Sequence, residues 1–374
     1  MLPKIMKNTP AVFAVGNEYQ IMVLVSAPTV MWVRIKDKFY YDDSNGILRS
    51  DTEIHRITVP MSVLDDAGAY TVCWKEVYER KAYFPLLGEE QNVDFAFHPV
   101  RGSEIRAYMI SDAHGFLKEP IAAARKFEEQ YGKADLLILN GDILSNSGDI
   151  ANFSLYYQII EALTGGEYPA IVSRGNHDLR GKCAERLVDY MPGQNGKSYY
   201  TVRLGKLWAV LLDLGEDKSD GNEEYNGTIC CHDFRQRETA FFEKVAENKN
   251  DEFDMADAEH RIAISHVPLT RADMTPAESE RPFCEEWVRL LNERIKPEFM
   301  LSGHTHWQYI AYPGGKYDGF GMNFPTVVGA YVDRENPYFA GCGIIWESKG
   351  IRVVFNDGER ILEETLLVSD RKDS

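Results

Sequence analysis

The sequence lacks several features that would assign it to a broad class of protein. No apolar run approaches the roughly 18 residues that a membrane-spanning helix requires. Residues 1–20 contain only a short apolar stretch and no small-residue cleavage site, so we expect no signal peptide. The six cysteines include no CxxC pair and form no regular framework. These absences predict reduced thiols and a cytoplasmic protein.

Basic charge is also in deficit. The chain has 41 lysines and arginines against 58 aspartates and glutamates, which gives a formal net charge of -17. Nucleic acids and anionic membranes bind to basic patches, so we expect neither as a partner. A small anionic substrate is compatible with this charge, because bound divalent cations can invert the field locally.

The 374 residues are enough for two domains. Residues 1–101 consist of β-branched and aromatic runs separated by turn-rich pieces such as DDSNG and DDAGA, a pattern typical of a β-sandwich. Within this part, DDAGAYTVCW resembles the strand-entry segment of immunoglobulin and fibronectin type III domains. Cys73 lies one place after the immunoglobulin cysteine position, so no disulfide between sheets is expected. We predict a small all-β accessory domain.

Residues 102–374 alternate between strands and helices, which predicts a layered α/β domain. Five of its apolar strands, in order along the chain, are followed by residues that can bind metal ions: Asp112 and His114, Asp142, Asn176 with His177 and Asp178, His266, and His304 with His306. Ligands of open α/β sheets collect at the carboxyl ends of strands. Each residue alone is more often a turn residue or a helix cap, but the ordered set indicates one metal site.

The ordered set resembles the pattern of the calcineurin-like metallophosphoesterase superfamily, which runs D-x-H, G-D, G-N-H-[DE], a later histidine and G-H-x-H. The corresponding segments here are SDAHG, NGDILS, RGNHDL, SHVP and SGHTH, within residues 105–330. The resemblance implies two central sheets flanked by helices, and a hydrolase of phosphoric monoesters or diesters. A sandwich ahead of the catalytic domain is similar to the layout of purple acid phosphatases, although the DxH triplet departs from their usual DxG.

The resemblance also implies a dinuclear metal centre. One ion would be bound by Asp112, His114, Asp142 and His306, and the other by Asp142, Asn176, His266 and His304, so that Asp142 bridges. These nitrogen-rich ligands without thiolate suit Mn, Fe or Zn, with Co and Ni also open, better than Mg or Ca. A hydroxide bridging the ions would be the nucleophile for in-line attack on phosphorus.

Three further residues follow from the same pattern. His177 is the family's non-ligand histidine, which implies that it stabilises the transition state or protonates the leaving oxygen. Asp178 is a candidate for orienting His177, with a helix cap as the alternative, and Arg180 is a candidate phosphate ligand. Ser145 stands where protein phosphatases of the superfamily have an aspartate paired with the catalytic histidine. The partner of His177 therefore stays open.

Three functions from different classes are compatible with these observations, the third being metal storage or sensing without turnover. The first is a dinuclear hydrolase of a small phosphate ester or a phosphopeptide, with loops at residues 215–234 and 268–283 selecting the substrate. The second is a non-catalytic binding or targeting protein whose N-terminal sandwich engages a carbohydrate or protein partner. Exposed aromatic side chains on the sandwich would favour binding, whereas packing against the α/β domain would favour a structural role. The sequence leaves the oligomeric state open.

Overall fold

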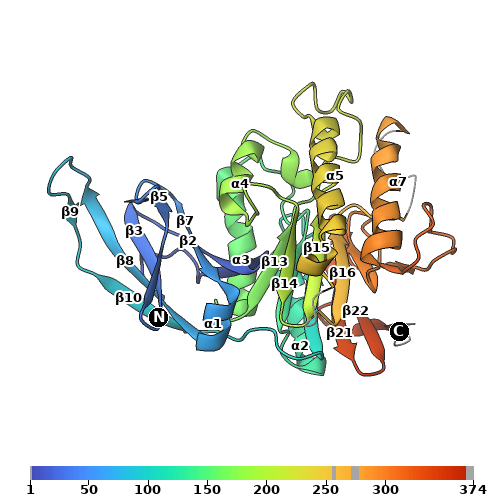
Figure 1. Cartoon of the computed structure of the whole chain (residues 1–374), viewed down its shortest axis with the longest axis horizontal. Helices are drawn as coiled ribbons and strands as arrows, with labels where there is room; N and C mark the ends of the chain where they lie inside the picture. The colour runs from blue at the N-terminus through green and yellow to red at the C-terminus, as the bar shows by residue number, and fades with distance from the viewer. Residues whose placement is uncertain (1, 255–257, 271–277, 368–374) are drawn as a thin grey trace.

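The computed structural model of the chain describes residues 2–254, 258–270 and 278–367, and two large β-sheets lie at its centre (Figure 1). The larger sheet has ten strands. Its order is β23 (Ile361–Leu367), β22 (Gly350–Asn356), β21 (Tyr338–Glu347), β11 (Ile105–Ile110), β12 (Leu136–Asn140), β13 (Pro169–Ser173), β1 (Ala11–Val15), β2 (Glu18–Leu24) and β7 (Ile54–Pro60), with β20 (Tyr331–Asp333) paired to β21. Strands β11, β12 and β13 are parallel to one another.

The second central sheet has six strands. Its order is β14 (Tyr200–Leu204), β15 (Leu207–Leu212), β16 (His260–Ser265), β17 (Phe299–Ser302), β19 (Thr326–Val328) and β18 (Tyr309–Ala311). Strands β15, β16, β17 and β19 are parallel, so their carboxyl ends share one edge of the sheet.

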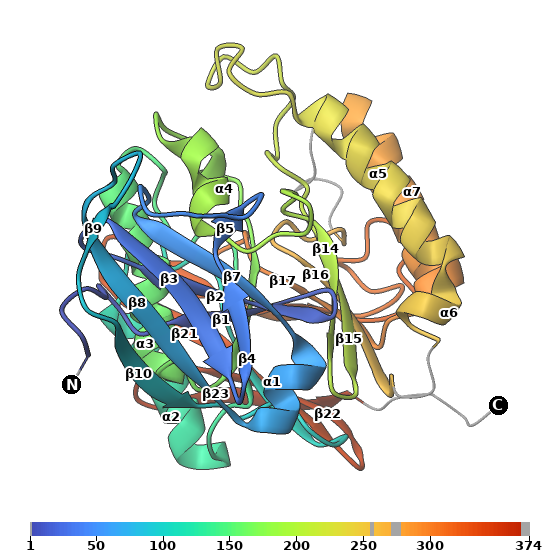
Figure 2. The same ribbon diagram turned by 60° about the vertical axis from the view of Figure 1, so that its left-hand side comes forward.

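Helices cover the outer faces of both sheets, as predicted for a layered α/β core (Figures 1 and 2). Alternate residues of a strand face opposite layers. In β12, Leu136 and Ile138 pack in the core between the sheets, whereas Leu137 and Leu139 pack under α2 (Lys118–Tyr131) and α3 (Ser154–Thr164). The outer face of the six-stranded sheet packs in the same way against α5 (Cys231–Glu247) and α7 (Arg281–Leu290).

The remaining helices of residues 2–254, 258–270 and 278–367 are short. They are α1 (Met61–Ala67), α4 (Leu187–Tyr190), α6 (Lys249–Glu252), the 3-10 helices Ile150–Phe153, His177–Leu179, Ala184–Arg186 and Glu278–Glu280, and a π-helical turn at Leu291–Ile295. In the described part of the chain, no helix combines the length and the apolar character needed to cross a membrane.

The predicted N-terminal sandwich is present, and one of its two sheets belongs to the central core. The other sheet contains β10 (Gln91–Ala96), β8 (Ala69–Glu79), β3 (Thr29–Ile35) and β4 (Lys38–Tyr41), with β9 (Leu86–Leu87) paired to β8. This sheet packs over β2 and β7 through one apolar core and lies in front in Figure 2. A small ribbon of β5 (Asp43–Ser44) and β6 (Ile47–Leu48) adjoins it.

Backbone pairing continues from the sandwich into the α/β core. Strand β1 runs parallel to β13, with Val12 opposite Pro169 and Phe13 opposite Ala170. The turn after β1 also contacts the second sheet, because the Gly16 N–H donates to the Thr201 carbonyl at 2.7 Å. Strand β1, which precedes the predicted boundary between residues 101 and 102, is thus hydrogen-bonded to β13, which follows it. The division into two domains at this boundary stays a prediction.

Candidate metal centre

The predicted ligands come from both central sheets. Asp112, His114, Asp142 and Asn176 follow β11, β12 and β13 of the ten-stranded sheet, whereas His266, His304 and His306 follow β16 and β17 of the six-stranded sheet. The carboxyl ends of these parallel strands point to the same end of the two-sheet core, which is why residues almost 200 positions apart meet, as His114 and His306 do.

The backbone is strained at most of these residues. Asp112, His114, Asp142, His304 and His306 all have positive φ angles, between 46° and 70°. They account for five of the eleven such non-glycine residues in the described part of the chain. A left-handed backbone is unfavourable for residues with a Cβ and persists where the surrounding structure imposes it, which is common at functional sites.

Glycines beside the ligands allow the strand ends to approach closely. A Cβ atom on Gly175 would lie 2.2 Å from Asp142 Oδ1, and one on Gly303 would lie 1.8 Å from Ser111 Oγ. A Cβ on Gly141 would lie 2.6 Å from the His266 ring. The glycines of the G-D, G-N-H and G-H-x-H segments are therefore required by the packing of the site.

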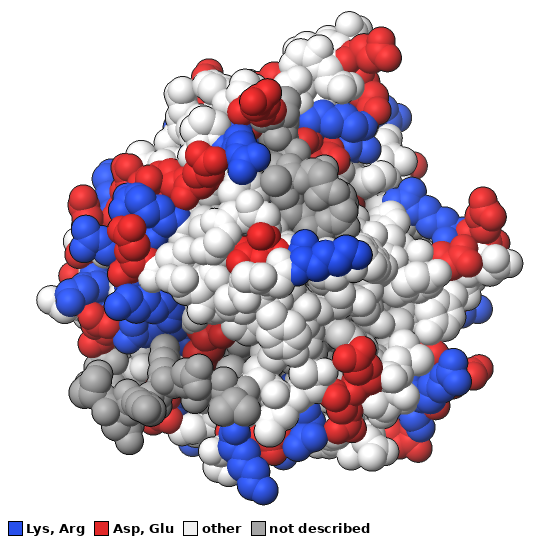
Figure 3. Space-filling view, turned by 90° about the vertical axis from the view of Figure 1, so that its right-hand side faces the viewer, with Lys and Arg blue, Asp and Glu red and all other residues white. Residues whose placement is uncertain are grey.

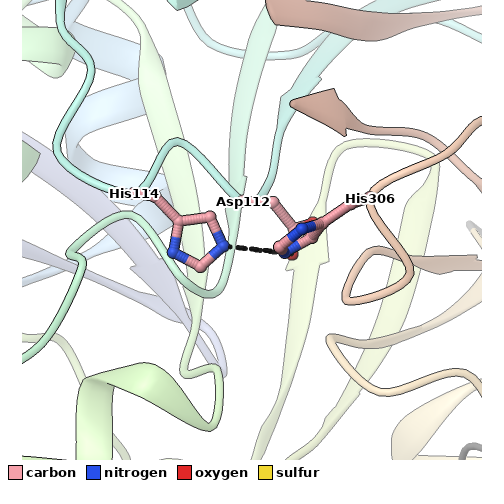
Figure 4. Close-up of side chains that lie close together, drawn as sticks. All are labelled: Asp112, His114 and His306. Atoms are coloured by element: carbon pink, nitrogen blue, oxygen red, sulfur yellow. Dashed lines mark hydrogen bonds and ion pairs between the residues drawn. The ribbon is translucent and has the colours of Figure 1, made fainter. Parts of the chain in front are cut away.

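One group of ligands consists of Asp112, His114 and His306 (Figure 4). The Nε2 atoms of His114 and His306 lie 2.9 Å apart. Asp112 Oδ1 is 3.5 Å from His306 Nε2 and 3.9 Å from His114 Nε2. These three potential ligand atoms all lie within 4.8 Å of one another, so a single metal ion could contact all of them.

A second group consists of Asp142, His266 and His304, with Asn176 beside it. His266 Nε2 lies 3.2 Å from Asp142 Oδ2, and His304 Nδ1 lies 3.1 Å from the Asn176 amide. The same Asp142 Oδ2 atom is 3.9 Å from His114 Nε2 in the first group. Asp142 is therefore placed between the two groups, as a bridging ligand must be.

The surroundings of His266 favour a positive charge at this place. Its Nδ1 atom donates to the Asn140 carbonyl at 2.8 Å, which directs Nε2 into the site. Among the described residues this buried Nε2 has no hydrogen-bond partner of good geometry. Burial lowers the pKa of His266, but the Asp142 and Asp112 carboxylates outweigh burial and raise it to about 10.

Two of the other candidate ligand imidazoles have pKa values below the ordinary value of 6.5. Burial lowers the pKa of His304 to about 4 and that of His114 to about 2. Neutral imidazole, carboxylate and amide oxygen make up the donor set, and transition-metal ions bind such sets. This donor set and the two converging groups fit a pair of such ions.

His177 lies beside the ligands without being one of the predicted set. Its backbone N–H donates to Asp142 Oδ1 at 2.8 Å, and its ring centroid is 4.8 Å from that of His114. Its Nδ1 atom donates to the backbone carbonyl of Ser145 at 3.0 Å. The ring of His177 is therefore held by the main-chain carbonyl of residue 145. This is the position at which protein phosphatases of the superfamily have an aspartate.

Asp178 has a different position from the one expected for a partner of His177. Its carboxylate is fully buried and accepts hydrogen bonds from the backbone N–H groups of Asp142, at 3.0 Å, and Gly175, at 2.9 Å. Burial, with a contribution from Asp142, raises the pKa of Asp178 to about 7. Asp178 thus supports the backbone that carries the ligands, and the Ser145 carbonyl takes the orienting role.

Arg180 and Arg174 are both engaged by carboxylates. Arg180 donates from Nε and Nη2 to the two oxygens of the buried Glu216, each at 2.7 Å. Arg174 forms an ion pair with Asp213 at 2.8 Å. The Arg180–Glu216 pair holds the start of the 215–234 loop beside the site, and phosphate binding by Arg180 stays a prediction. Of the second predicted loop, residues 271–277 lie outside the described residues.

Asp217 and Arg334 are charged residues near the site that were not predicted from the sequence. Asp217 Oδ2 lies 3.6 Å from His304 Nε2, and Arg334 Nη2 lies 2.7 Å from His114 Nε2. Both residues are outside the five motif segments. Asp217 belongs to a loop that the sequence singled out, but no spacing or composition distinguished Arg334.

The model of the family described as calcineurin-like phosphoesterase matches residues 105–308, which is more than half of the chain. The chain belongs to the calcineurin-like phosphoesterase family. It is accordingly a metal-dependent hydrolase of phosphoric esters, and the family implies a dinuclear metal site at the two ligand groups.

A solved structure supports the fold of this phosphoesterase. The purple acid phosphatase PPD1 from yellow lupin (Lupinus luteus) seeds superposes with a TM-score of 0.59 at 12% sequence identity, covering 98% of this chain and 76% of that chain. This match includes the N-terminal sandwich as well as the core. TT1561 of Thermus thermophilus matches with a TM-score of 0.36 at 13% identity, covering 70% of this chain and 99% of that chain. No curated protein matches the chain.

Proposed function

We propose that this phosphoesterase is a dinuclear hydrolase of small phosphate esters, with Mn, Fe or Zn at the two ligand groups. The observation that carries the proposal is the position of Asp142, whose Oδ2 atom faces His266 in one group and His114 in the other. Two bound ions would lower the pKa of a water molecule and neutralise charge on the phosphate.

The protein's own residues would position the reacting groups. Donation from His177 Nδ1 to the Ser145 carbonyl leaves Nε2 as the ring nitrogen available to the leaving oxygen. The Asp142 carboxylate also accepts from the His177 backbone N–H at 2.8 Å, so ligand and histidine keep a fixed relation. This arrangement supports a role for His177 in protonating the leaving group or in stabilising the transition state.

Surface charge supports a small substrate. On the face shown in Figure 3, the basic side chains of the described residues are interspersed with acidic ones. The net charge of -17 disfavours extended polyanions, which bind through continuous basic surfaces. A small phosphate ester or a phosphopeptide needs only the local positive charge of the site.

The test is hydrolysis of p-nitrophenyl phosphate and bis-p-nitrophenyl phosphate by metal-free protein that is refilled separately with Mn, Fe, Zn, Co and Ni. We expect turnover with at least one ion, and losses of about 100-fold or more in His177→Ala and Asp142→Asn. The exposed His98→Ala and Asp37→Asn are matched controls that should keep full turnover. Absence of turnover with every ion and both esters would overturn the proposal for small esters.

The alternative of a targeting role for residues 1–101 has one observation in its favour. Around the β8–β9 hairpin, which projects from the molecule in Figure 1, the apolar residues Tyr78, Tyr83, Phe84, Leu86 and Leu87 are exposed. The opposite face of the same sheet packs on β2 and β7, which favours a structural role for the sandwich. The complete ligand set argues that any such role accompanies hydrolysis.

A further inference from the structure

Among the described residues, three arginines lie beside the metal centre, and they differ in whether a carboxylate pairs with them. Arg180 is paired with Glu216 and Arg174 with Asp213. Among the described residues, no ion pair joins Arg334 to a carboxylate, and its side chain is exposed. In the described part of the chain, Arg334 is thus the one of these three arginines that no carboxylate engages within ion-pair distance.

The backbone fixes Arg334 at the site. It lies in the turn between β20 and β21, and Asp333 Oδ1 accepts from the N–H groups of Glu335 at 2.9 Å and Asn336 at 3.1 Å. Strand β21 pairs with β11, the strand that leads to Asp112. The turn is thus part of the same sheet as the first ligand group.

The guanidinium lies against a ligand. Arg334 Nη2 is 2.7 Å from His114 Nε2 and 2.8 Å from Nδ1 of the same ring. A guanidinium can only donate hydrogen bonds, and a ring nitrogen that binds a metal ion has no lone pair left to accept one. When a neutral His114 binds an ion through Nε2, its Nδ1 atom carries the ring proton, so neither ring nitrogen can accept. Arg334 then requires another acceptor at the same place.

We propose that this acceptor is a terminal phosphate oxygen of the substrate, and that Arg334 makes the enzyme prefer monoesters. The inference rests on the proposed function and deepens it. Two ions can each take one phosphate oxygen. A monoester dianion has a third terminal oxygen, whereas a diester has an uncharged ester oxygen in its place. Charge-assisted donation from a guanidinium therefore favours the monoester.

The test compares the Mn-loaded wild type with Arg334→Gln and Arg334→Lys. Three quantities are measured: kcat/KM for p-nitrophenyl phosphate and for bis-p-nitrophenyl phosphate, the affinity for inorganic phosphate by calorimetry, and the metal content. In Arg334→Gln we expect kcat/KM for the monoester to fall about 10- to 100-fold and that for the diester to change less than about threefold. Phosphate affinity should weaken about 10-fold, with partial recovery in Arg334→Lys.

Arg360→Gln is the matched control, because it removes an exposed arginine from the turn between β22 and β23 of the same sheet. It should change none of the three quantities. Equal losses for both esters with unchanged phosphate affinity would overturn the proposal. So would a higher metal content in Arg334→Gln, which would mean that Arg334 only competes with an ion for His114.

Phosphate binding separates this proposal from the proposed function. If the wild type binds phosphate but hydrolyses neither ester, hydrolysis of small esters fails while the calorimetric comparison still tests Arg334. If Arg334→Gln binds phosphate as tightly as the wild type, the Arg334 proposal fails whatever the turnover.

Discussion

At the scale of single residues, the metal centre depends on the glycines beside the candidate ligands as much as on the ligands themselves, because the glycines have no side chain. Asp142 can contact both ligand groups because Gly175 has no side chain where the Asp142 carboxylate lies. Its backbone N–H is held by the buried Asp178. Backbone hydrogen bonds and close main-chain contacts thus determine where the candidate ligands lie.

We predict that Gly175→Ala disrupts the centre although it replaces none of the candidate ligands. The new Cβ would lie 2.2 Å from Asp142 Oδ1 and 2.4 Å from its backbone nitrogen, so the bridging carboxylate must move. We expect a lower metal content and a loss of about 1–3 kcal/mol in the free energy of unfolding, measured by metal analysis and chemical denaturation.

Gly221→Ala is the control for this substitution, because a Cβ there meets nothing within 4 Å and its φ is not positive. It should leave metal content unchanged and stability within about 0.5 kcal/mol. Full metal occupancy in Gly175→Ala would show that Asp142 can be displaced without loss of either ion.

The motifs made the grouping of the candidate ligands predictable, because each of these residues follows an apolar strand within a few positions. Arg334 and the Ser145 carbonyl were not predictable in this way. Arg334 reaches His114 only because β21 pairs with β11 across more than 200 residues. The Ser145 contact uses a main-chain atom that any residue would supply, so its side chain gave no signal.

At the scale of elements, helix α5 carries a buried acid into the core. Glu238 is fully buried, and its Oε1 atom accepts from the backbone N–H of Asp213 at 2.7 Å. Burial, together with the Asp213 carboxylate, raises the pKa of Glu238 well above its usual value. The folded chain therefore keeps a proton that the unfolded chain loses above its ordinary pKa of 4.5.

This shift gives a signed pH dependence. Because the folded state binds more protons, the contribution of Glu238 to stability falls as pH rises from about 4.5 towards its folded pKa. We predict that Glu238→Gln, which cannot ionise, loses less stability than the wild type between pH 5 and pH 8, as measured by thermal unfolding. The exposed Glu243→Gln on the same helix is the control and should follow the wild type. Parallel curves for wild type and Glu238→Gln would contradict the prediction.

The burial of β1 and β2 also distinguishes them from strands of a separate accessory sandwich. Strand β1 is AVFAV and is buried at every residue, and β2 is buried at all but its first residue. A continuous apolar run is typical of a strand covered on both faces, as in the interior of a layered sheet. An accessory sandwich with one solvated face would instead alternate apolar and polar residues.

At the scale of the whole molecule, the sandwich and the α/β core share one ten-stranded sheet. Removing residues 1–101 would leave β13 unpaired on one edge and would uncover Ala170 and Val172, which pack in the same apolar cluster as Phe13. The ring of Phe13 also contacts that of Tyr157 on α3, with centroids 6.3 Å apart.

We predict that residues 102–374 expressed alone do not form a stable monomer. Exposed edge strands pair with other chains, so aggregation or a loosely packed state is the expected outcome. Size-exclusion chromatography and near-ultraviolet circular dichroism would detect either, with the full chain as the reference. A monomeric fragment that unfolds cooperatively would contradict the prediction. It would show that the α/β core is an independent domain that is stable without the pairing of β1 to β13.

The shared sheet also sets an order of events while the chain is being made. Val12 leaves the ribosome 157 residues before Pro169, its partner in the finished sheet. At typical rates of synthesis of about 5–20 residues per second, the β1 edge waits about 8–30 s for that partner. The nascent sandwich therefore passes through a period with an open apolar edge, in which a chaperone that shields extended segments would raise the yield of native enzyme.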